Sequence, residues 1–145
     1  MGADPVFVDT NVLVYANQEL AEFHEQASAR LTEIDEAGAP FWISRQILRE
    51  YLAVVTRQHG LGAALPPSLA ARRVRQFESL FRVAEDGPEV TEVLLDLLTR
   101  FPTAGRQVHD ANIVATMLAH GIDRLLTFNT ADFKRFFGLI RLEPV

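Results

Sequence analysis

The stretch VFVDTNVLVYA (residues 6–16) decides the fold that we expect, because it joins a strand to the start of a helix through a carboxylate. Val6–Val8 is apolar throughout, which is typical of a strand in a parallel sheet buried on both faces. Asp9 follows at once, inside an otherwise apolar run. The simplest explanation is a helix N-cap formed by Asp9, Thr10 or Asn11, since all three residue types cap helices well. A chemical role for Asp9 requires partners from elsewhere in the chain.

Expected strands and helices alternate along the rest of the sequence. This alternation indicates βαβ units and a parallel sheet with helices on both faces. Ligands of such sheets bind at the carboxyl ends of the strands, where Asp9 lies. Ser44 and Thr130 are expected to cap the helices that follow them. We expect strands at 6–8, 41–43, 82–85, 125–128 and 139–142, and helices at 19–37, 44–58, 68–81, 88–101, 109–120 and 130–137.

Glu50 is the second acid in an unusual place. On the expected helix 44–58 it falls at the margin of the apolar face, on the same side as Ile47 and Val54. A surface Glu should lie opposite the core. The alternative is an edge Glu that keeps its carboxylate in water and pairs with Arg49 or Arg57.

Asp110 is the strongest candidate for a functional acid. It stands three, four, seven and eight residues before Ile113, Val114, Met117 and Leu118, at the centre of one apolar helical stripe. The helix dipole favours an acid in the first turn, but it does not explain an inward direction. We therefore predict that Asp110 points towards a site.

Asp132 repeats the arrangement of Asp9, because it follows the expected strand 125–128 at the start of a helix. A first-turn acid behind a Thr130 cap is the alternative explanation. Together, the four acids come from distant parts of the chain and reach one edge of the sheet. Clustered carboxylates raise one another's pKa values unless a cation intervenes, and oxygen ligands suit Mg²⁺ or Mn²⁺ rather than Zn²⁺. Such sites favour attack on phosphorus.

Composition sets the outer limits of the prediction. The chain has 145 residues, 48% of them hydrophobic, so we expect a single domain, residues 1–145, with a substantial core. No apolar run is long enough to span a membrane, no secretory signal is apparent, and zero cysteines fit a cytoplasmic location. The net charge of −5 argues against a broad non-specific nucleic-acid surface, although 13 of the 14 basic residues are Arg.

The chain resembles the PIN-domain ribonucleases, and especially the VapC-type toxins of VapBC toxin–antitoxin modules. The resemblance rests on VFVDTNVLVYA, SRQILREYLAVVTR, HDANIVATMLAHG, and LLTFNTADFKRF followed by LIRLEP, which in this order cover nearly the whole chain. It implies a three-layer α/β/α fold with a four- or five-stranded parallel sheet. It also implies a metal-dependent endoribonuclease of a type II system that inhibits translation.

The resemblance also assigns roles to individual residues. Asp9, Glu50, Asp110 and Asp132 match the acidic positions of the family, where they hold Mg²⁺ or Mn²⁺ directly or through water. Thr10, Asn11, Thr127 and Asn129 match supporting polar positions. The implied partners are an RNA substrate of unspecified kind, a VapB-type antitoxin and a second copy of the chain. Candidates for RNA backbone contact are Arg45, Arg49, Arg72, Arg73, Arg75 and Arg106.

Three other functions compete with this prediction. The chain could be a PIN nuclease of RNA processing outside any toxin module, or an RNA- or protein-binding domain with a vestigial site. A haloacid-dehalogenase-like phosphatase also begins with a strand and an Asp, but it needs a second acid two residues later. Asn11 stands at that position here, and Lys134 is the sole lysine. Leu65, Leu69 and Phe77 are open to either an interface or the core.

Overall fold

A computed structural model describes residues 3–57 and 63–145, and within them five parallel strands form one sheet in the order β3-β2-β1-β4-β5. The strands are β1 (Val6–Val8), β2 (Phe41–Ser44), β3 (Arg82–Ala84), β4 (Arg124–Thr127) and β5 (Arg141–Pro144). The helices are α1 (Thr10–Ala16), α2 (His24–Glu36), α3 (Arg45–Val55), α4 (Pro67–Leu80), α5 (Pro88–Arg100), α6 (Gln107–Ala119) and α7 (Thr130–Phe133), followed by a 3₁₀ turn, η1 (Lys134–Phe136).

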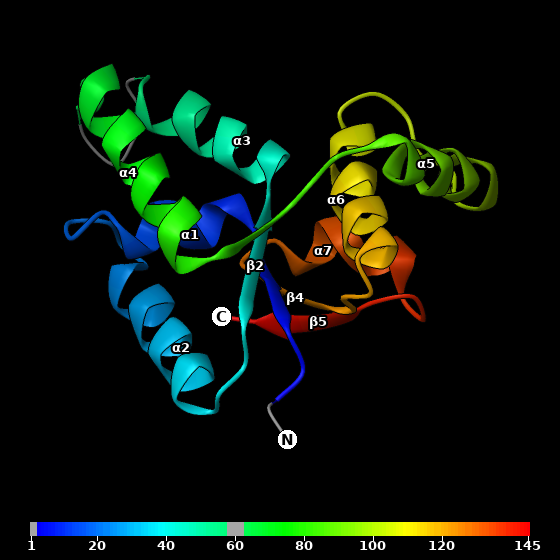
Figure 1. The fold of residues 1–145 in the computed structure, drawn as a ribbon, viewed down its shortest axis with the longest axis horizontal. Coiled ribbons are helices and arrows are strands. Elements are labelled where there is room, and N and C mark those ends of the chain that lie inside the picture. The colour runs from blue at the N-terminus through cyan, green and yellow to red at the C-terminus, as the bar shows by residue number, and fades with distance from the viewer. Residues whose placement is uncertain (1–2, 58–62) are drawn as a thin grey trace.

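Helices cover both faces of the sheet, as Figure 1 shows. Helices α1 to α4 gather on one side, and α5 and α6 pack together on the other. The predicted three-layer α/β/α fold and the five-stranded parallel sheet are therefore confirmed. Among the described residues, no helix combines the length and the apolar character that a bilayer crossing requires.

The core explains why β1 lies at the centre of the sheet. All three residues of Val6–Val8 are fully buried, because helices cover both of their faces. Leu125 and Leu126 of the neighbouring strand are equally buried. The sequence left Phe77 open to either an interface or the core. Phe77 is a core residue with 4% exposure. This rigid centre holds the carboxyl ends of β1 and β4 next to each other.

Several predicted boundaries were wrong by a few residues. The helix expected from residue 19 begins at His24. The His24 ring forms a hydrogen bond with the Tyr15 carbonyl across the turn after α1. Helix α6 begins at Gln107, two residues earlier than predicted, and β5 begins at Arg141 because Gly138, with φ +96°, turns the chain first. The expected helix 44–58 ends at Val55, and its last predicted residue lies outside the described ones.

The two predicted caps had different outcomes. Ser44 caps α3 as expected, because its hydroxyl accepts a hydrogen bond from the Ile47 N–H at 3.3 Å. The predicted cap from Thr130 was wrong: Asn129 precedes α7, and no side chain caps that helix. The segment predicted as one helix from Thr130 is a single α turn followed by η1.

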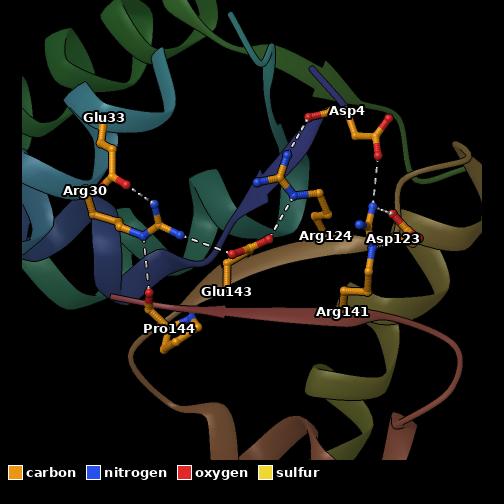
Figure 2. Close-up of polar contacts among 8 residues, drawn as sticks. All are labelled: Asp4, Arg30, Glu33, Asp123, Arg124, Arg141, Glu143 and Pro144. Atoms are coloured by element: carbon orange, nitrogen blue, oxygen red, sulfur yellow. Dashed lines mark hydrogen bonds and ion pairs between the residues drawn. The ribbon is translucent and has the colours of Figure 1, made fainter. Parts of the chain in front are cut away.

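A chain of ion pairs ties α2 and the N-terminal segment to the edge of the sheet (Figure 2). Arg30 and Arg124 both contact Glu143 of β5, at 3.1 and 2.9 Å. Arg141 bridges Asp4 and Asp123. Partly exposed pairs of this kind contribute up to about 1 kcal/mol each. None of these pairs involves Asp9, Glu50, Asp110 or Asp132.

Candidate active site

Asp9 combines a capping role with a place in the site. It is 6% exposed at the carboxyl end of β1, and its Oδ1 accepts the Thr10 N–H at 2.8 Å, which makes Asp9 itself the N-cap of α1. Thr10 and Asn11 lie inside the helix, so neither is the cap. The second oxygen, Oδ2, accepts from the Thr127 hydroxyl at 2.8 Å and from the Asn11 amide at 3.2 Å.

The environment of Asp9 raises its pKa to about 6, and burial is the main cause. The hydrogen bonds from Thr127 and Thr10 oppose this shift, whereas the charge of Glu50 adds to it. Asp9 is therefore a buried carboxylate that is well supplied with neutral donors, and no ion pair between residues that the structure describes engages it.

Glu50 reaches the same place from α3. Its carboxylate accepts from the Gln46 amide at 3.2 Å and from the Thr10 hydroxyl at 3.3 Å. Its hydrogen bonds thus go to neutral groups, and no ion pair with Arg49 or Arg57 forms. Burial, followed by the charge of Asp110, raises the pKa of Glu50.

Asp110 and Asp132 approach from the first turns of α6 and α7. Burial, followed by the charges of Asp132 and Asp9, raises the pKa of Asp110 to about 6, and the charge of Arg135 opposes this shift. Both residues are thus acids in the first turn of a helix, as the alternative explanation proposed. That position is compatible with membership of the predicted cluster of carboxylates. All four acids line one cavity of about 630 Å³.

The acids lie where two hollows meet. The cavity of about 630 Å³ and a neighbouring one of about 620 Å³ share Glu50, Arg106, Asp110 and Asp132 in their walls. One stripe of α3 borders both hollows at spacings of three and four residues. That stripe consists of Gln46, Arg49, Glu50, Ala53 and Val54.

A divalent cation fits this donor set through water. No ion pair among the described residues engages any of the four acids, so their charge is uncompensated by direct contact. Within residues 3–57 and 63–145, no three Asp, Glu, His or Cys side chains are arranged to hold one ion between them. Mg²⁺ keeps several of its waters and takes one or two carboxylates directly, which matches acids that converge without forming a closed cage.

The supporting residues predicted from the sequence form a tight network at the end of β4. The Thr127 hydroxyl donates to Asp9 and accepts from the Asn129 N–H at 2.9 Å. Asn11 accepts from the Phe128 N–H at 3.2 Å. This network locks the β1 and β4 ends together and fixes the direction of the Asp9 carboxylate.

The six predicted RNA-contact arginines separate into groups. Arg49 and Arg106 line the cavities. Arg45 pairs with Glu78 and Glu85, Arg75 pairs with Glu78, Arg73 donates to Asn17, and Arg72 is exposed on α4. Arg57 lines the larger cavity and was not among the predictions. Its position two helical turns after Glu50 is the signal that could have identified it.

Gln46 is a second residue that sequence reasoning missed. It is 6% exposed and donates to Glu50 and to the His109 carbonyl at 2.9 Å, while its own oxygen accepts from Asn112 at 2.8 Å. Gln46 therefore links the carboxylate of Glu50 to the start of α6, next to Asp110. Its place one helical turn before Glu50 was the available signal.

If the RNA cleavage expected from the sequence takes place here, Gln46→Met should lower its kcat by about tenfold with little change in KM, because Glu50 and α6 lose their shared donor. The His109 carbonyl and the Asn112 amide lose their hydrogen bonds to Gln46 in this variant, which should also lower the free energy of unfolding by about 1–2 kcal/mol. Steady-state kinetics and urea unfolding measure both effects. Gln76→Met, at an exposed position of α4, is the matched control. An unchanged kcat in Gln46→Met would show that Gln46 does not position Glu50 for the reaction.

Comparison with known proteins agrees with this fold. The PIN domain family model matches residues 6–138, and the chain belongs to that family. The chain is similar to Ribonuclease VapC48 of Mycobacterium tuberculosis, with 29% identity over 138 residues that cover 94% of each chain.

Solved structures of VapC proteins have a similar fold. VapBC2 from Rickettsia felis, bound to a DNA fragment from its promoter, has a TM-score of 0.72 at 19% identity and covers 99% of each chain. VapC20 of Mycobacterium tuberculosis, a sarcin-ricin loop cleaving toxin, has a TM-score of 0.71 at 20% identity, over 94% of this chain and 98% of that one. The PIN-like fold and the predicted resemblance to VapC proteins are confirmed.

Proposed function

We propose that residues 1–145 form a single PIN domain that hydrolyses RNA phosphodiester bonds as the toxin of a type II toxin–antitoxin module. One observation carries this proposal: four carboxylates from β1, α3, α6 and α7 converge on one cavity, and none is paired with a cation among the described residues. A structural role does not require four clustered carboxylates without ion-pair partners, whereas phosphodiester hydrolysis with a divalent cation does.

The acids divide into two roles in this proposal. Asp9, Asp110 and Asp132 hold Mg²⁺ or Mn²⁺, in part through water, and Glu50 completes the site and orients the attacking water. A divalent cation bound there supplies positive charge for the phosphate oxygens and makes water more acidic. Gln46 and Thr10 keep the Glu50 carboxylate in place through their hydrogen bonds. Arg106 and Arg57 lie at the cavity wall, where a phosphate backbone would pass.

The reaction is an in-line displacement at phosphorus. Water attacks the phosphorus atom, the bond to the 3′ oxygen breaks, and that oxygen takes up a proton. The products are a 3′-hydroxyl end and a 5′-phosphate end. Glu50 faces the cavity and accepts neutral hydrogen bonds, so it is placed to orient the water as it loses its proton.

The toxin role and the partners follow from the relatives. VapC48 is a ribonuclease by name, and several structural neighbours are VapBC complexes, so we propose a VapB-type antitoxin for this chain. Expression of the chain alone should arrest growth, and co-expression of the small protein encoded beside it should relieve the arrest. A chain that cleaves RNA without arresting growth would instead belong to RNA processing.

The ends of the RNA products test the chemistry directly. Incubation of the protein with Mn²⁺ and end-labelled single-stranded RNA should give fragments with 5′-phosphate and 3′-hydroxyl ends. Single-stranded DNA of the same sequence serves as the comparison. Fragments that end in 2′,3′-cyclic phosphate would show attack by the RNA's own 2′-hydroxyl, and they would contradict hydrolysis by an oriented water.

A further inference from the structure

The two hollows beside the acids differ in chemistry. In the larger one, Val14, Tyr15, Ala53 and Val54 form a wall that we call the apolar compartment. In the smaller one, the wall beyond the shared acids consists of Gln46, Arg49, Gln107 and His109, which we call the polar compartment. A strand whose scissile phosphate lies at the acids can therefore reach Tyr15 and its apolar neighbours in the larger hollow and mainly polar side chains in the smaller one.

Tyr15 is the aromatic residue of the apolar compartment, and two neighbouring aromatic rings hold its ring in place. It is half-buried, and its ring makes edge contacts with Phe128 at 4.9 Å and Phe23 at 5.4 Å, with interplanar angles of 73° and 81°. Tyr15 lies on α1, and these contacts brace its ring from two other segments of chain, the turn before α2 and the turn after β4. A braced ring loses little conformational entropy when a ligand stacks on it.

Small side chains and cations complete the compartment. Ala53 and Val54 of α3 leave room opposite α1, and the α3 stripe from Gln46 to Val54 runs for about 12 Å along both hollows. Arg57 and Arg106 lie in the wall of the same cavity, where they complement a phosphate backbone. Apolar walls, an aromatic face and flanking cations are the combination that binds an unpaired nucleotide.

We propose that the apolar compartment binds one unpaired nucleobase of the RNA strand, stacked on Tyr15, beside the phosphate that is cleaved. This inference rests on the proposed function, because the acids define where the scissile phosphate lies. A base inside a duplex has both faces covered by its neighbours, so the compartment selects single-stranded segments. Substrate choice then depends partly on which base stacks best next to the cleaved bond.

The test compares binding of two short RNA strands of equal length to the non-cleaving Asp110→Asn protein at fixed salt and Mg²⁺. One strand is oligoadenylate, and the other carries an abasic ribose-phosphate backbone. We expect oligoadenylate to bind about tenfold more tightly. Tyr15→Leu in the same background should abolish that preference, whereas Tyr15→Phe, which keeps the aromatic face, should retain it. Phe137→Leu, an exposed aromatic that lines neither hollow, should also retain it.

Three outcomes would overturn the inference. The first is equal affinity of the Asp110→Asn protein for both strands. The second is an unchanged preference for oligoadenylate in Tyr15→Leu. The third is a Tyr15→Leu protein that loses affinity for the antitoxin but keeps its affinity for oligoadenylate. The last outcome would assign the compartment to a protein partner. Failure of the proposed function is distinguishable, because the wild-type protein would then cleave no RNA even if the base preference persisted.

Discussion

Asp110→Asn should lower RNA cleavage by about a hundredfold or more while the fold is retained. Asp110 lies within the electrostatic field of the cluster, since the charges of Asp132 and Asp9 add to the effect of burial on its pKa. The amide has nearly the same shape as the carboxyl group but lacks its charge. The variant therefore loses its attraction for a divalent cation without leaving a void.

The same variant should be more stable than the wild-type protein when no divalent cation is present. Removal of one charge from the cluster relieves repulsion, and we expect a gain of about 1 kcal/mol in unfolding free energy at neutral pH. Asp35→Asn, on the exposed face of α2, is the matched control and should change neither quantity. Wild-type cleavage by Asp110→Asn, with normal folding, would show that Asp110 is not part of the site.

Metal-free protein should become less stable as the pH rises from about 4.5 to 7.5. The pKa of Asp9 rises from its ordinary value of 3.8 to about 6 in the folded chain, so the folded state binds the proton more tightly than the unfolded state does. Stability from this group is present at low pH and is lost as the pH rises towards the folded pKa. Asp9 accounts for about 2 kcal/mol of the decrease, and the partly exposed Asp110 adds about 1 kcal/mol.

Urea unfolding in the presence of a chelator measures this decrease. Asp110→Asn should show a smaller pH dependence than the wild-type protein, and Asp35→Asn should show the full dependence. Saturating Mg²⁺ should restore stability at pH 7.5 in the wild-type protein, because an ion that binds the folded state alone stabilises it. An unfolding free energy that stays constant or rises over this pH range would mean that burial and mutual repulsion do not raise the pKa values of these acids.

The fold and the convergence of the four acids on one cavity were predictable from the sequence because the signals for the individual elements are local. The apolar run before Asp9 identifies β1, and the apolar stripe around Asp110 requires that residue to face inward. The convergence of the acids follows from the topology, since β1 and β4 are adjacent parallel strands whose carboxyl ends meet. That expectation needed no knowledge of side-chain contacts.

Other features of the site depend on tertiary contacts that no local pattern specifies. Gln46 looks like an ordinary polar helix residue until α6 brings the His109 carbonyl and the Asn112 amide to it. The arginines show the same limit, because Arg45 is directed away by acids 33 and 40 residues distant in the chain. Thr130 failed as a cap because α7 begins one residue earlier than predicted: the Asn129 carbonyl accepts the Asp132 N–H, so Asn129 occupies the N-cap position and Thr130 lies inside the helix.

The central claim is that RNA cleavage requires a divalent cation held by carboxylates of Asp9, Glu50, Asp110 and Asp132. The most direct test is the rate of cleavage of labelled single-stranded RNA by metal-stripped protein as Mn²⁺ is added. We predict no cleavage in chelator, a saturable rise with Mn²⁺, and no such rise in Asp110→Asn. Cleavage at the same rate in chelator and in Mn²⁺ would contradict the account.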